Sequence, residues 1–207
     1  MKRNLLFITI VLITALSSCV KDRIPPATPV VTVSANDTLM YFWSFNNADS
    51  SNHKADFSIP GYTGNFSYSA SYVDYTGGSP LNLIGITDSG QCLRIRNPSN
   101  YLIFSMPTTG YDSVALSFAA EASSTTSGST INEVTYTTDG VNYISTALAN
   151  NQYTLGITFS LQTFDFSKDP NVNNNPNFAV KITFVNNNTG TSGNDRFDNV
   201  ALSGVRK

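Results

Sequence analysis

Hydrophobic and polar residues alternate along most of the chain with a period of two, which is typical of half-buried β-strands. In residues 114–118 every second side chain is apolar, and in residues 178–184 the apolar side chains fall on one face while Lys181 and Thr183 fall on the other. From Leu39 onward no stretch of about twelve residues shows the helical period. The expected strands are residues 39–46, 66–73, 91–97, 101–106, 113–122, 133–138, 141–146, 161–166, 178–185 and 196–205.

About ten short strands without a helix predict an all-β fold. We expect an antiparallel two-sheet β-sandwich with jelly-roll topology. An immunoglobulin-type sandwich is the alternative, but it is expected to have about seven strands, and a true immunoglobulin domain adds a Cys…Trp…Cys pattern that the chain lacks. Asp139-Gly140 is a turn signal between two of the expected strands.

The first residues have the features of an export signal. Lys2 and Arg3 precede an apolar run from Leu5 to Leu16, which is too short to span a bilayer as a helix. The segment that follows, Leu16-Ser17-Ser18-Cys19, resembles the lipobox of bacterial lipoproteins, in which the Cys becomes the acylated first residue. Residues 1–18 are therefore expected to be a lipoprotein signal peptide and Cys19 the lipidation site. An ordinary secretory signal that contains a Cys is the alternative.

A tether and one domain follow this signal. Residues 19–37 hold the lipidated Cys and three prolines, which favour a semi-extended linker, and residues 38–207 form the sandwich domain. The membrane is thus an expected partner through the N-terminal lipid. The expected location is the cell envelope, in the outer membrane of a Gram-negative bacterium, on its periplasmic or surface face. With Cys19 lipidated, Cys92 has no disulfide partner, and its alternating surroundings predict a buried, inert thiol.

Composition narrows the functional classes. Charged residues make up 13% of the chain, about half the usual fraction of ~25%, and Asn, Ser and Thr take their place, which suits an extracellular all-β domain. Lys and Arg number 12 against 14 Asp and Glu, without a basic block, so nucleic acid is not an expected partner. The single histidine, His53, lies in a polar stretch and is expected at the surface, and it leaves no material for a histidine-based metal site.

A series of short motifs runs from about residue 91 to 205. Its most specific member is Arg196-x-Asp198-Asn199-Val200. The others are Tyr101-Leu102, Pro107 to Tyr111, Leu116-Ser117-Phe118, Tyr136 to Gly140, Phe164-Asp165-Phe166 and Asn174 to Phe184. The order of these motifs resembles that of the accessory jelly-roll modules of secreted and cell-surface bacterial proteins, which resemble carbohydrate-binding modules and MAM-like domains.

The resemblance implies one structural calcium ion, because related sandwiches often share one between the last strand and the region of the first. Asp198 and Asn199 match the last-strand positions, and Asn46 and Asn47 would be the partners. Carboxylate, amide and backbone oxygens all serve calcium, although positions 46 and 47 offer no carboxylate. The alternative is that Asp198 accepts backbone N–H bonds at a strand end, with Arg196 as an ionic partner.

Tyrosines make up the candidate ligand site. Jelly-roll modules hold sugars by stacking rings on aromatic side chains while amides and carboxylates bond the hydroxyl groups. Four tyrosines gather between the first strand and the matched half of the chain, and by parity Tyr68 and Tyr72 share a strand face with Phe66. The only Trp, Trp43, alternates with apolar neighbours and is expected in the core. The candidate ligand-binding residues are Tyr62, Tyr68, Tyr72 and Tyr75.

No catalytic constellation is evident. Glu121 and Glu133 flank one loop, but they lack the Glu-x-Asp-x-Glu strand motif of jelly-roll glucanases, and we expect them at the solvated rim. A nucleophile elbow, a P-loop and a dinucleotide fingerprint are absent. The expected function is a non-enzymatic, lipid-anchored binding module that captures a glycan or another surface ligand. The alternative is a structural or adhesive surface protein that contacts envelope proteins through the sandwich.

Overall fold

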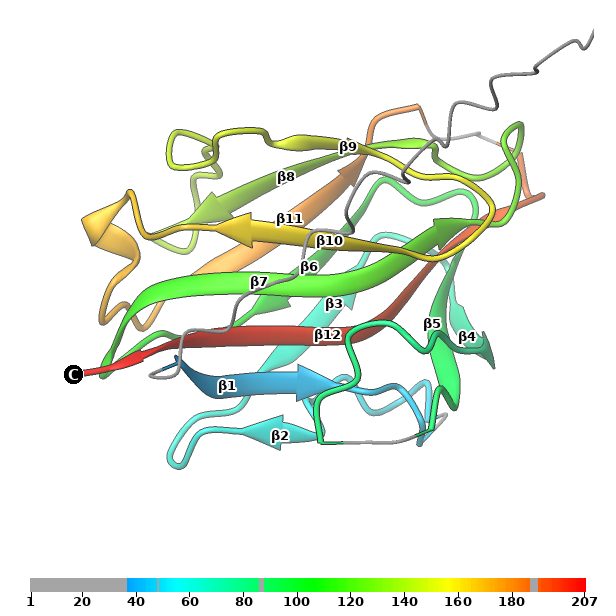
Figure 1. Ribbon diagram of the computed structural model, residues 1–207. Helices are drawn as coiled ribbons and strands as arrows, with labels where there is room; N and C mark the ends of the chain where they lie inside the picture. Colours follow the sequence, from blue (N-terminus) through cyan, green and yellow to red (C-terminus); the bar gives the residue numbers. More distant parts are fainter. Residues whose placement is uncertain (1–36, 48, 86–87, 187–189) are drawn as a thin grey trace, which may run out of the picture. The chain divides into compact units, whose positions relative to one another are not determined.

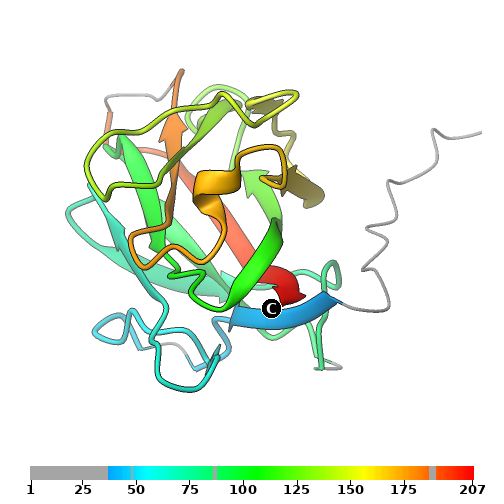
Figure 2. The same ribbon diagram turned by 90° about the vertical axis from the view of Figure 1, so that its left-hand side faces the viewer.

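The protein is described by a computed structural model that covers residues 37–207 apart from residues 48, 86–87 and 187–189. In this part of the chain nearly all regular structure is β-strand, arranged in two antiparallel sheets that pack face to face (Figures 1 and 2). The predicted all-β fold, a two-sheet jelly-roll sandwich, is confirmed.

One sheet has seven strands among the described residues. Its path runs β10-β7-β12-β1-β2, and β5 pairs with β12 while β4 pairs with β5 (Figure 1). All the pairs are antiparallel, and the long β12 pairs with β1 and β5 on one side and with β7 on the other. The bounds are β1 Asp37–Trp43, β2 Phe57–Ser58, β4 Val73–Gly77, β5 Gln91–Arg96, β7 Tyr111–Ala122, β10 Ser160–Asp165 and β12 Asn194–Arg206.

The other sheet has five strands in the described part of the chain, in the order β3-β6-β11-β8-β9. Its central strand, β11, pairs with β6 on one side and β8 on the other. A short 3₁₀ helix, η1 (Pro170–Val172), precedes β11. The bounds are β3 Asn65–Tyr68, β6 Tyr101–Ser105, β8 Ile131–Thr137, β9 Gln152–Thr154 and β11 Ala179–Phe184.

The core lies between the two sheets and follows the alternation of the sequence. Every second residue of 114–118 is fully buried, and Lys181 and Thr183 lie on the opposite, half-exposed face of β11, as predicted. Trp43 is 1% exposed and stacks edge-on against Phe104 at 5.0 Å between ring centroids, which confirms its expected place in the core. Burying such side chains is the main source of stability in a fold of this kind.

Two expected strands are wrong. Residues 66–73 do not form one strand: β3 ends at Tyr68 in the five-stranded sheet, and β4 begins at Val73 in the seven-stranded sheet. The chain changes sheets in between, where the Ser69 hydroxyl accepts the N–H of Tyr101 at 3.0 Å. Residues 141–146 make only an isolated bridge, Ile144 with Tyr136. The short β2 and β9 were not predicted, since each has too few residues to show a period.

The predicted signal peptide, the lipidation site Cys19 and nearly all of the tether lie outside the described residues. Within residues 37–207 as described, no helix is long and apolar enough to cross a membrane. The domain expected from residue 38 has its first strand, β1, starting at Asp37.

Candidate ligand-binding surfaces

The outer face of the five-stranded sheet carries aromatic and charged side chains together. Because side chains alternate along a strand, the residues of β6, β8 and β11 that do not enter the core gather on this face. Register pairs Lys181 with Ile103 on one side and Thr135 on the other. We call this surface the tyrosine–lysine face; its residues are Tyr101, Ile103, Glu133, Thr135, Tyr143, Lys181 and Thr183, all half-buried.

Lys181 lies between two tyrosine rings. Its Nζ is 5.3 Å from the centroid of the Tyr101 ring and 5.3 Å from that of Tyr143. Both distances are within the range of a cation–π contact, worth about 0.5–1 kcal/mol at an exposed site. Burial, with a smaller effect from Tyr101, raises the pKa of Tyr143. The two rings are therefore no more than about 11 Å apart and share one ammonium group.

Hydrogen-bonding groups border the two rings. Glu133 lies opposite Thr183 in the register, and its Oε1 accepts a hydrogen bond from Asn151 Nδ2 at 2.7 Å. Threonine hydroxyls, a carboxylate and an ammonium group thus lie beside the two aromatic rings on the outer, half-buried face of the sheet. This combination suits a ligand that has both C–H faces and hydroxyl groups.

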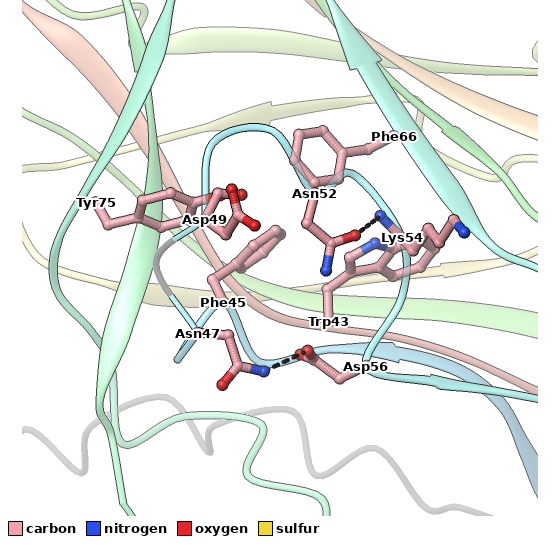
Figure 3. A pocket seen from close by; sticks show the side chains of 9 residues that line it. All are labelled: Trp43, Phe45, Asn47, Asp49, Asn52, Lys54, Asp56, Phe66 and Tyr75. Carbon is pink, nitrogen blue, oxygen red and sulfur yellow. Dashed lines mark hydrogen bonds between the residues drawn. The ribbon is translucent and has the colours of Figure 1, made fainter.

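A hollow, which we call the aromatic pocket, lies beside the loop after β1 (Figure 3). It is small, with a volume of about 20 Å³, which is about the space that one water molecule needs. The buried rings of Trp43, Phe45 and Phe66 line it, and Tyr75 of β4 forms one side. The remaining lining residues are the polar, exposed side chains of Asn47, Asp49, Asn52, Lys54 and Asp56.

The loop around the aromatic pocket is held by its own carboxylates. Asp56 Oδ2 accepts the N–H of Ser44 at 2.6 Å and its hydroxyl at 2.8 Å. Asp49 Oδ1 accepts the N–H and the hydroxyl of Ser51, and these bonds lower the pKa of Asp49. The Tyr75 hydroxyl donates to the Asp49 carbonyl at 3.1 Å, which connects β4 to the loop.

Phe45 has an unusual backbone. Its φ is +56°, in the left-handed region that a bulky residue rarely adopts and that costs about 1–3 kcal/mol. Its ring packs edge-on against Phe66 at 5.8 Å between centroids. The strained turn at Phe45 thus places an aromatic ring in the pocket lining directly after β1.

The four tyrosines predicted as ligand-binding residues do not form one surface. Tyr75 lines the aromatic pocket, and Tyr68 packs 5.4 Å from the His53 ring. Tyr72 is 54% exposed just before β4, and Tyr62 is 37% exposed after β2. The expectation that Tyr68 and Tyr72 share a strand face is wrong, because the chain leaves the five-stranded sheet between them.

The residues expected to hold calcium divide into two groups. Asn46 Oδ1 accepts the N–H of Gln91 at 2.7 Å, whereas Asn47 is exposed, lines the aromatic pocket and donates to Asp56 at 3.3 Å. Asp198 and Asn199 are fully buried in β12. Among the described residues there is no group of three or more His, Cys, Asp or Glu that could hold a metal ion.

Asp198 accepts hydrogen bonds from two backbone N–H groups, which agrees with the alternative to a calcium site given above. The N–H of Ser79 lies 2.6 Å from Oδ2 and that of Asn199 2.9 Å from Oδ1. Burial outweighs these bonds and raises the pKa of Asp198 to about 7. Arg196 is not its ionic partner: it pairs with Glu121 at 2.5 Å, because both lie on the outer face of the seven-stranded sheet in register.

Oxygens around Asp198 nevertheless offer a partial fit to calcium. Asn199 Oδ1 is buried and has no hydrogen-bond partner. A Cβ added to Gly78 would lie 2.7 Å from Asp198 Oδ2, and one added to Gly90 1.8 Å from Asn46 Oδ1. Gly78 and Gly90 are themselves joined by a backbone hydrogen bond of 3.0 Å. Asp198, Asn199 and Asn46 thus share one small region, which Asn47 does not join.

Three other candidates have clear structural roles. Glu121, expected at the solvated rim, is instead buried and paired with Arg196, and it lies on a different sheet from Glu133. His53 is half-buried, with its ring 4.7 Å from that of Phe66. Cys92 is buried as predicted, and burial raises its pKa to about 12.

The sequence did not single out the three residues at the centre of the tyrosine–lysine face, Lys181, Tyr101 and Tyr143, as a candidate site. Parity had placed Lys181 outward, and the same rule applied to residues 101–106 puts Tyr101 outward on the neighbouring strand. Tyr143 could not be found in this way. It comes close to Lys181 because the bridge between Ile144 and Tyr136 brings its loop alongside β8.

The fold is similar to that of a solved xylan-binding domain. The CBM22-1 xylan-binding domain of Xyn10C from Paenibacillus barcinonensis aligns with a TM-score of 0.52 and 10% identity, over 84% of this chain and 99% of that one. The mannan-recognising module TmCBM27 gives a TM-score of 0.44 and 10% identity, over 82% and 99%. The K2 adhesin domain of Lys-gingipain from Porphyromonas gingivalis gives 0.46 and 9%, over 82% and 98%. No protein-family model and no curated protein sequence matches the chain.

Proposed function

We propose that this protein is a lipid-anchored envelope module that captures a polysaccharide on the tyrosine–lysine face without catalysing a reaction. The observation that carries the proposal is the Lys181 ammonium group, held 5.3 Å from the centroid of each of two tyrosine rings on the outer face of the five-stranded sheet. A sugar has an apolar C–H face and a rim of hydroxyls, and this surface supplies aromatic rings and hydrogen-bonding groups side by side.

The residues of the tyrosine–lysine face would have different roles in binding a sugar. Tyr101 and Tyr143 provide rings for stacking, and Lys181 donates hydrogen bonds to hydroxyl oxygens. Glu133 accepts from hydroxyl hydrogens through the carboxylate oxygen that Asn151 does not use. Because the strands and the bridge at Ile144 hold these groups in place, little conformational entropy is lost on binding.

The similarity to a xylan-binding domain supports the fold of such a module and supplies the first probe. A polysaccharide that runs across strands β6, β11 and β8 would meet both rings. A sequence identity of 10% does not identify the ligand, so the first test uses xylan, mannan and β-1,4-galactan.

The envelope location depends on Cys19. Acylation of this residue would anchor the chain, and residues 20–37 would hold the sandwich away from the outer membrane. One acyl chain binds a membrane only marginally, so durable anchoring needs a multiply acylated Cys. Metabolic labelling with a radioactive fatty acid should mark the wild type and not Cys19→Ser, and an unlabelled wild type would contradict the anchor.

A structural calcium ion is a separate proposal. Asp198, Asn199 and Asn46 are the side chains that would hold it, with backbone oxygens completing the six to eight ligands that calcium needs. An ion bound only to the folded state raises the melting temperature. Millimolar calcium should therefore raise the melting temperature of the wild type over that in EDTA and leave Asp198→Asn unchanged. Equal melting temperatures of the wild type in calcium and in EDTA would refute the calcium proposal.

Affinity electrophoresis of the full chain in mild detergent tests the glycan proposal. We expect gels with one of the three polysaccharides to retard the wild type, and Tyr101→Ala and Tyr143→Ala to lose about tenfold in affinity each, which corresponds to about 1.4 kcal/mol for a stacked ring. Tyr72→Ala is the comparison variant because Tyr72 is exposed and comes just before β4 of the seven-stranded sheet.

Each outcome is informative. Loss of retardation in Tyr72→Ala alone would favour the tyrosine site predicted from the sequence over the tyrosine–lysine face. A folded wild type that none of the polysaccharides retards would favour the alternative of protein contacts within the envelope, and pull-down of envelope proteins would then follow.

A further inference from the structure

The outer face of the seven-stranded sheet carries charged side chains where β4, β5 and β12 lie side by side (Figure 1). Arg94 and Arg96 of β5 and Arg196 of β12 alternate with residues that enter the core, so all three lie on the outer face. Their side chains are between 20% and 28% exposed. We call this surface the arginine face; its residues are Tyr72, Asp74, Arg94, Arg96, Glu121 and Arg196.

The strand register brings two like charges together on this face. Arg94 lies directly opposite Arg196 in the pair of β5 with β12, and like charges in opposite positions of a sheet are destabilising. The two side chains bind carboxylates on opposite sides. Arg94 Nε lies 2.6 Å from Asp74 Oδ1 on β4, and Arg196 pairs with Glu121 on β7. The two ion pairs thus leave two neighbouring guanidinium groups over β5 and β12.

The paired carboxylates are fewer than the arginines. Asp74 is shared between Arg94 and Arg96, whose Nη2 atoms both lie 2.7 Å from its Oδ2. Glu121 pairs with Arg196. Three guanidinium groups therefore share two carboxylates, and the face keeps an excess of positive charge.

Asp198 follows Arg196 on the same side of β12 but does not reach the surface. It is fully buried, its Oδ2 accepts the N–H of Ser79 at 2.6 Å, and its Oδ1 accepts the N–H of Asn199 at 2.9 Å. A ligand on the arginine face would therefore meet guanidinium groups and not this carboxylate.

Each arginine also keeps hydrogen-bond donors that its partner does not use. Arg94 and Arg96 bind Asp74 through Nε and Nη2. Arg196 binds Glu121 through Nη1. Among the described residues no printed hydrogen bond uses Nη1 of Arg94, Nη1 of Arg96 or Nη2 of Arg196. A guanidinium group presents its N–H donors in a planar fork that matches a carboxylate, so these atoms suit an anionic ligand.

An exposed aromatic ring lies next to these donors. Tyr72 is 54% exposed and comes just before β4, where the register of β4 with β5 continues to Arg96. Asp74 chiefly, and Tyr72 to a smaller extent, raise the pKa of Arg94, which places the Tyr72 hydroxyl near this guanidinium group. An aromatic ring beside guanidinium groups matches a sugar that carries a carboxylate, because its C–H face stacks on the ring while the carboxylate binds the N–H fork.

We infer that the arginine face is a binding site for acidic polysaccharides whose sugar residues carry carboxylate groups. The carboxylates of the ligand would bind the unused Nη atoms of the three arginines, and one sugar ring would stack on Tyr72. The arginine face shares no residue with the tyrosine–lysine face and lies on the other sheet. The inference therefore does not depend on polysaccharide binding at the tyrosine–lysine face.

Titration calorimetry of the full-length protein in mild detergent and EDTA tests the inference, with polygalacturonate and alginate as the probes. The esterified form of each polymer is the matched ligand control, because it keeps the sugar rings and removes the charge. We expect the wild type to bind at least one acidic polymer and to bind its ester at least tenfold more weakly. Added sodium chloride should weaken binding of the acidic polymer, since salt screens partly exposed charges.

Two variants test the residues of the site. Arg96→Gln removes one guanidinium group and leaves Asp74 with its two hydrogen bonds from Arg94. Tyr72→Ala removes the exposed ring. Each should weaken binding of the acidic polymer about tenfold, as expected for one charged hydrogen-bonding group or one stacked ring. Arg96→Lys, which keeps the charge without the fork, should restore only part of the affinity, and Tyr72→Phe should bind as the wild type does.

The chain provides a matched control in Arg206. It is also an arginine of β12, but it is exposed at the other end of the strand, opposite Tyr111. Arg206→Gln removes the same charge from the protein and should leave binding of the acidic polymer unchanged. Because Tyr72 is exposed, Tyr72→Ala keeps the test decisive if Arg96→Gln fails to fold.

The inference is overturned if the folded wild type binds neither acidic polymer, or binds the ester as tightly as the acid. It is equally overturned if the folded Arg96→Gln and Tyr72→Ala variants bind as the wild type does, or if Tyr143→Ala removes the signal instead. Duplex DNA that binds as tightly as the acidic polymer would show a general polyanion surface and overturn the assignment to sugars. Retention of acidic polymers without retardation by neutral polysaccharides would refute only the proposed role of the tyrosine–lysine face.

Discussion

Asp195 is a carboxylate inside the sandwich, and its replacement gives a sharp test of the core. The residue is fully buried in β12, opposite Ile95 and Ala122 of the neighbouring strands. Its Oδ1 accepts the N–H of Ser129 at 2.9 Å, and Oδ2 has no hydrogen-bond partner. Tyr153 is the titratable group that interacts with it, and none of the ion pairs among the described residues includes Asp195.

Burial determines the charge of this group. Loss of solvation raises the pKa of Asp195 from 3.8 to about 8, against the smaller effect of the Ser129 hydrogen bond. The folded protein thus keeps a proton here that the unfolded chain releases near pH 4. A raised pKa in the folded state contributes stability that is fully present below pH 4 and is lost as the pH rises to about 8.

The size of the effect follows from linkage. While the folded state holds one proton more than the unfolded state, each pH unit costs about 1.4 kcal/mol of unfolding free energy. Over the window from pH 4 to 8 the loss due to Asp195 reaches at most about 5 kcal/mol. Asp195→Asn cannot ionise and retains an oxygen for the Ser129 N–H, so it should lack this loss and gain on the wild type as the pH rises.

Urea unfolding of the wild type and Asp195→Asn at several pH values between 4.5 and 8.5 measures the difference. Other titrating groups, Asp198 among them, are present in both proteins and cancel in the comparison. The difference in unfolding free energy should grow steadily in favour of the variant. If the unfolding free energies of the wild type and Asp195→Asn change with pH in parallel, the reasoning is refuted. Asp165→Asn, which changes an exposed carboxylate, is the control, and its unfolding free energy should run parallel to that of the wild type.

Three further predictions concern single side chains. Cys92 is buried with its pKa raised to about 12, so a thiol reagent at pH 8 should label it only as fast as the protein unfolds, and rapid labelling of the folded state would contradict its place in the core. Gly64→Ala should destabilise by about 1–3 kcal/mol in thermal unfolding, because its Cβ would lie 2.7 Å from Tyr41 Cδ1 and 2.9 Å from Trp43 Cη2; an unchanged melting temperature would show that the rings can move. Glu121→Gln should cost about 1–2 kcal/mol in urea unfolding, since it leaves Arg196 without its buried carboxylate partner, and a neutral result would mean that this pair contributes no net stability.

The strands that the sequence predicts best are those with one face in the core. Alternation in residues 178–184 and 113–122 reflects burial directly, and β11 and β7 lie within a residue or two of the expected bounds. The segment 66–73 keeps the same alternation although it crosses between sheets. The segment divides because β3 pairs with β6 in one sheet and β4 pairs with β5 in the other. These partners are distant in sequence, so the local pattern of residues 66–73 does not predict the division.

The candidate surfaces depend on the same kind of distant pairing. Parity alone gives the outward direction of Lys181 and Thr183, but the contact of Lys181 with Tyr143 needs the bridge at Ile144. In the aromatic pocket the loop residues are close in sequence, whereas Tyr75 arrives from β4. Of the four tyrosines that the sequence predicts as ligand-binding residues, Tyr75 lines the aromatic pocket.

The central claim is that the tyrosine–lysine face binds a polysaccharide, and a crystal structure with a bound oligosaccharide tests it most directly. The oligosaccharide would be a fragment of whichever polysaccharide retards the wild type in the gels. The account predicts sugar rings against Tyr101 and Tyr143, with hydroxyl groups bonded to Lys181 and Glu133. Sugar bound only elsewhere on the folded protein, or a tyrosine–lysine face left bare at saturating oligosaccharide, would contradict it.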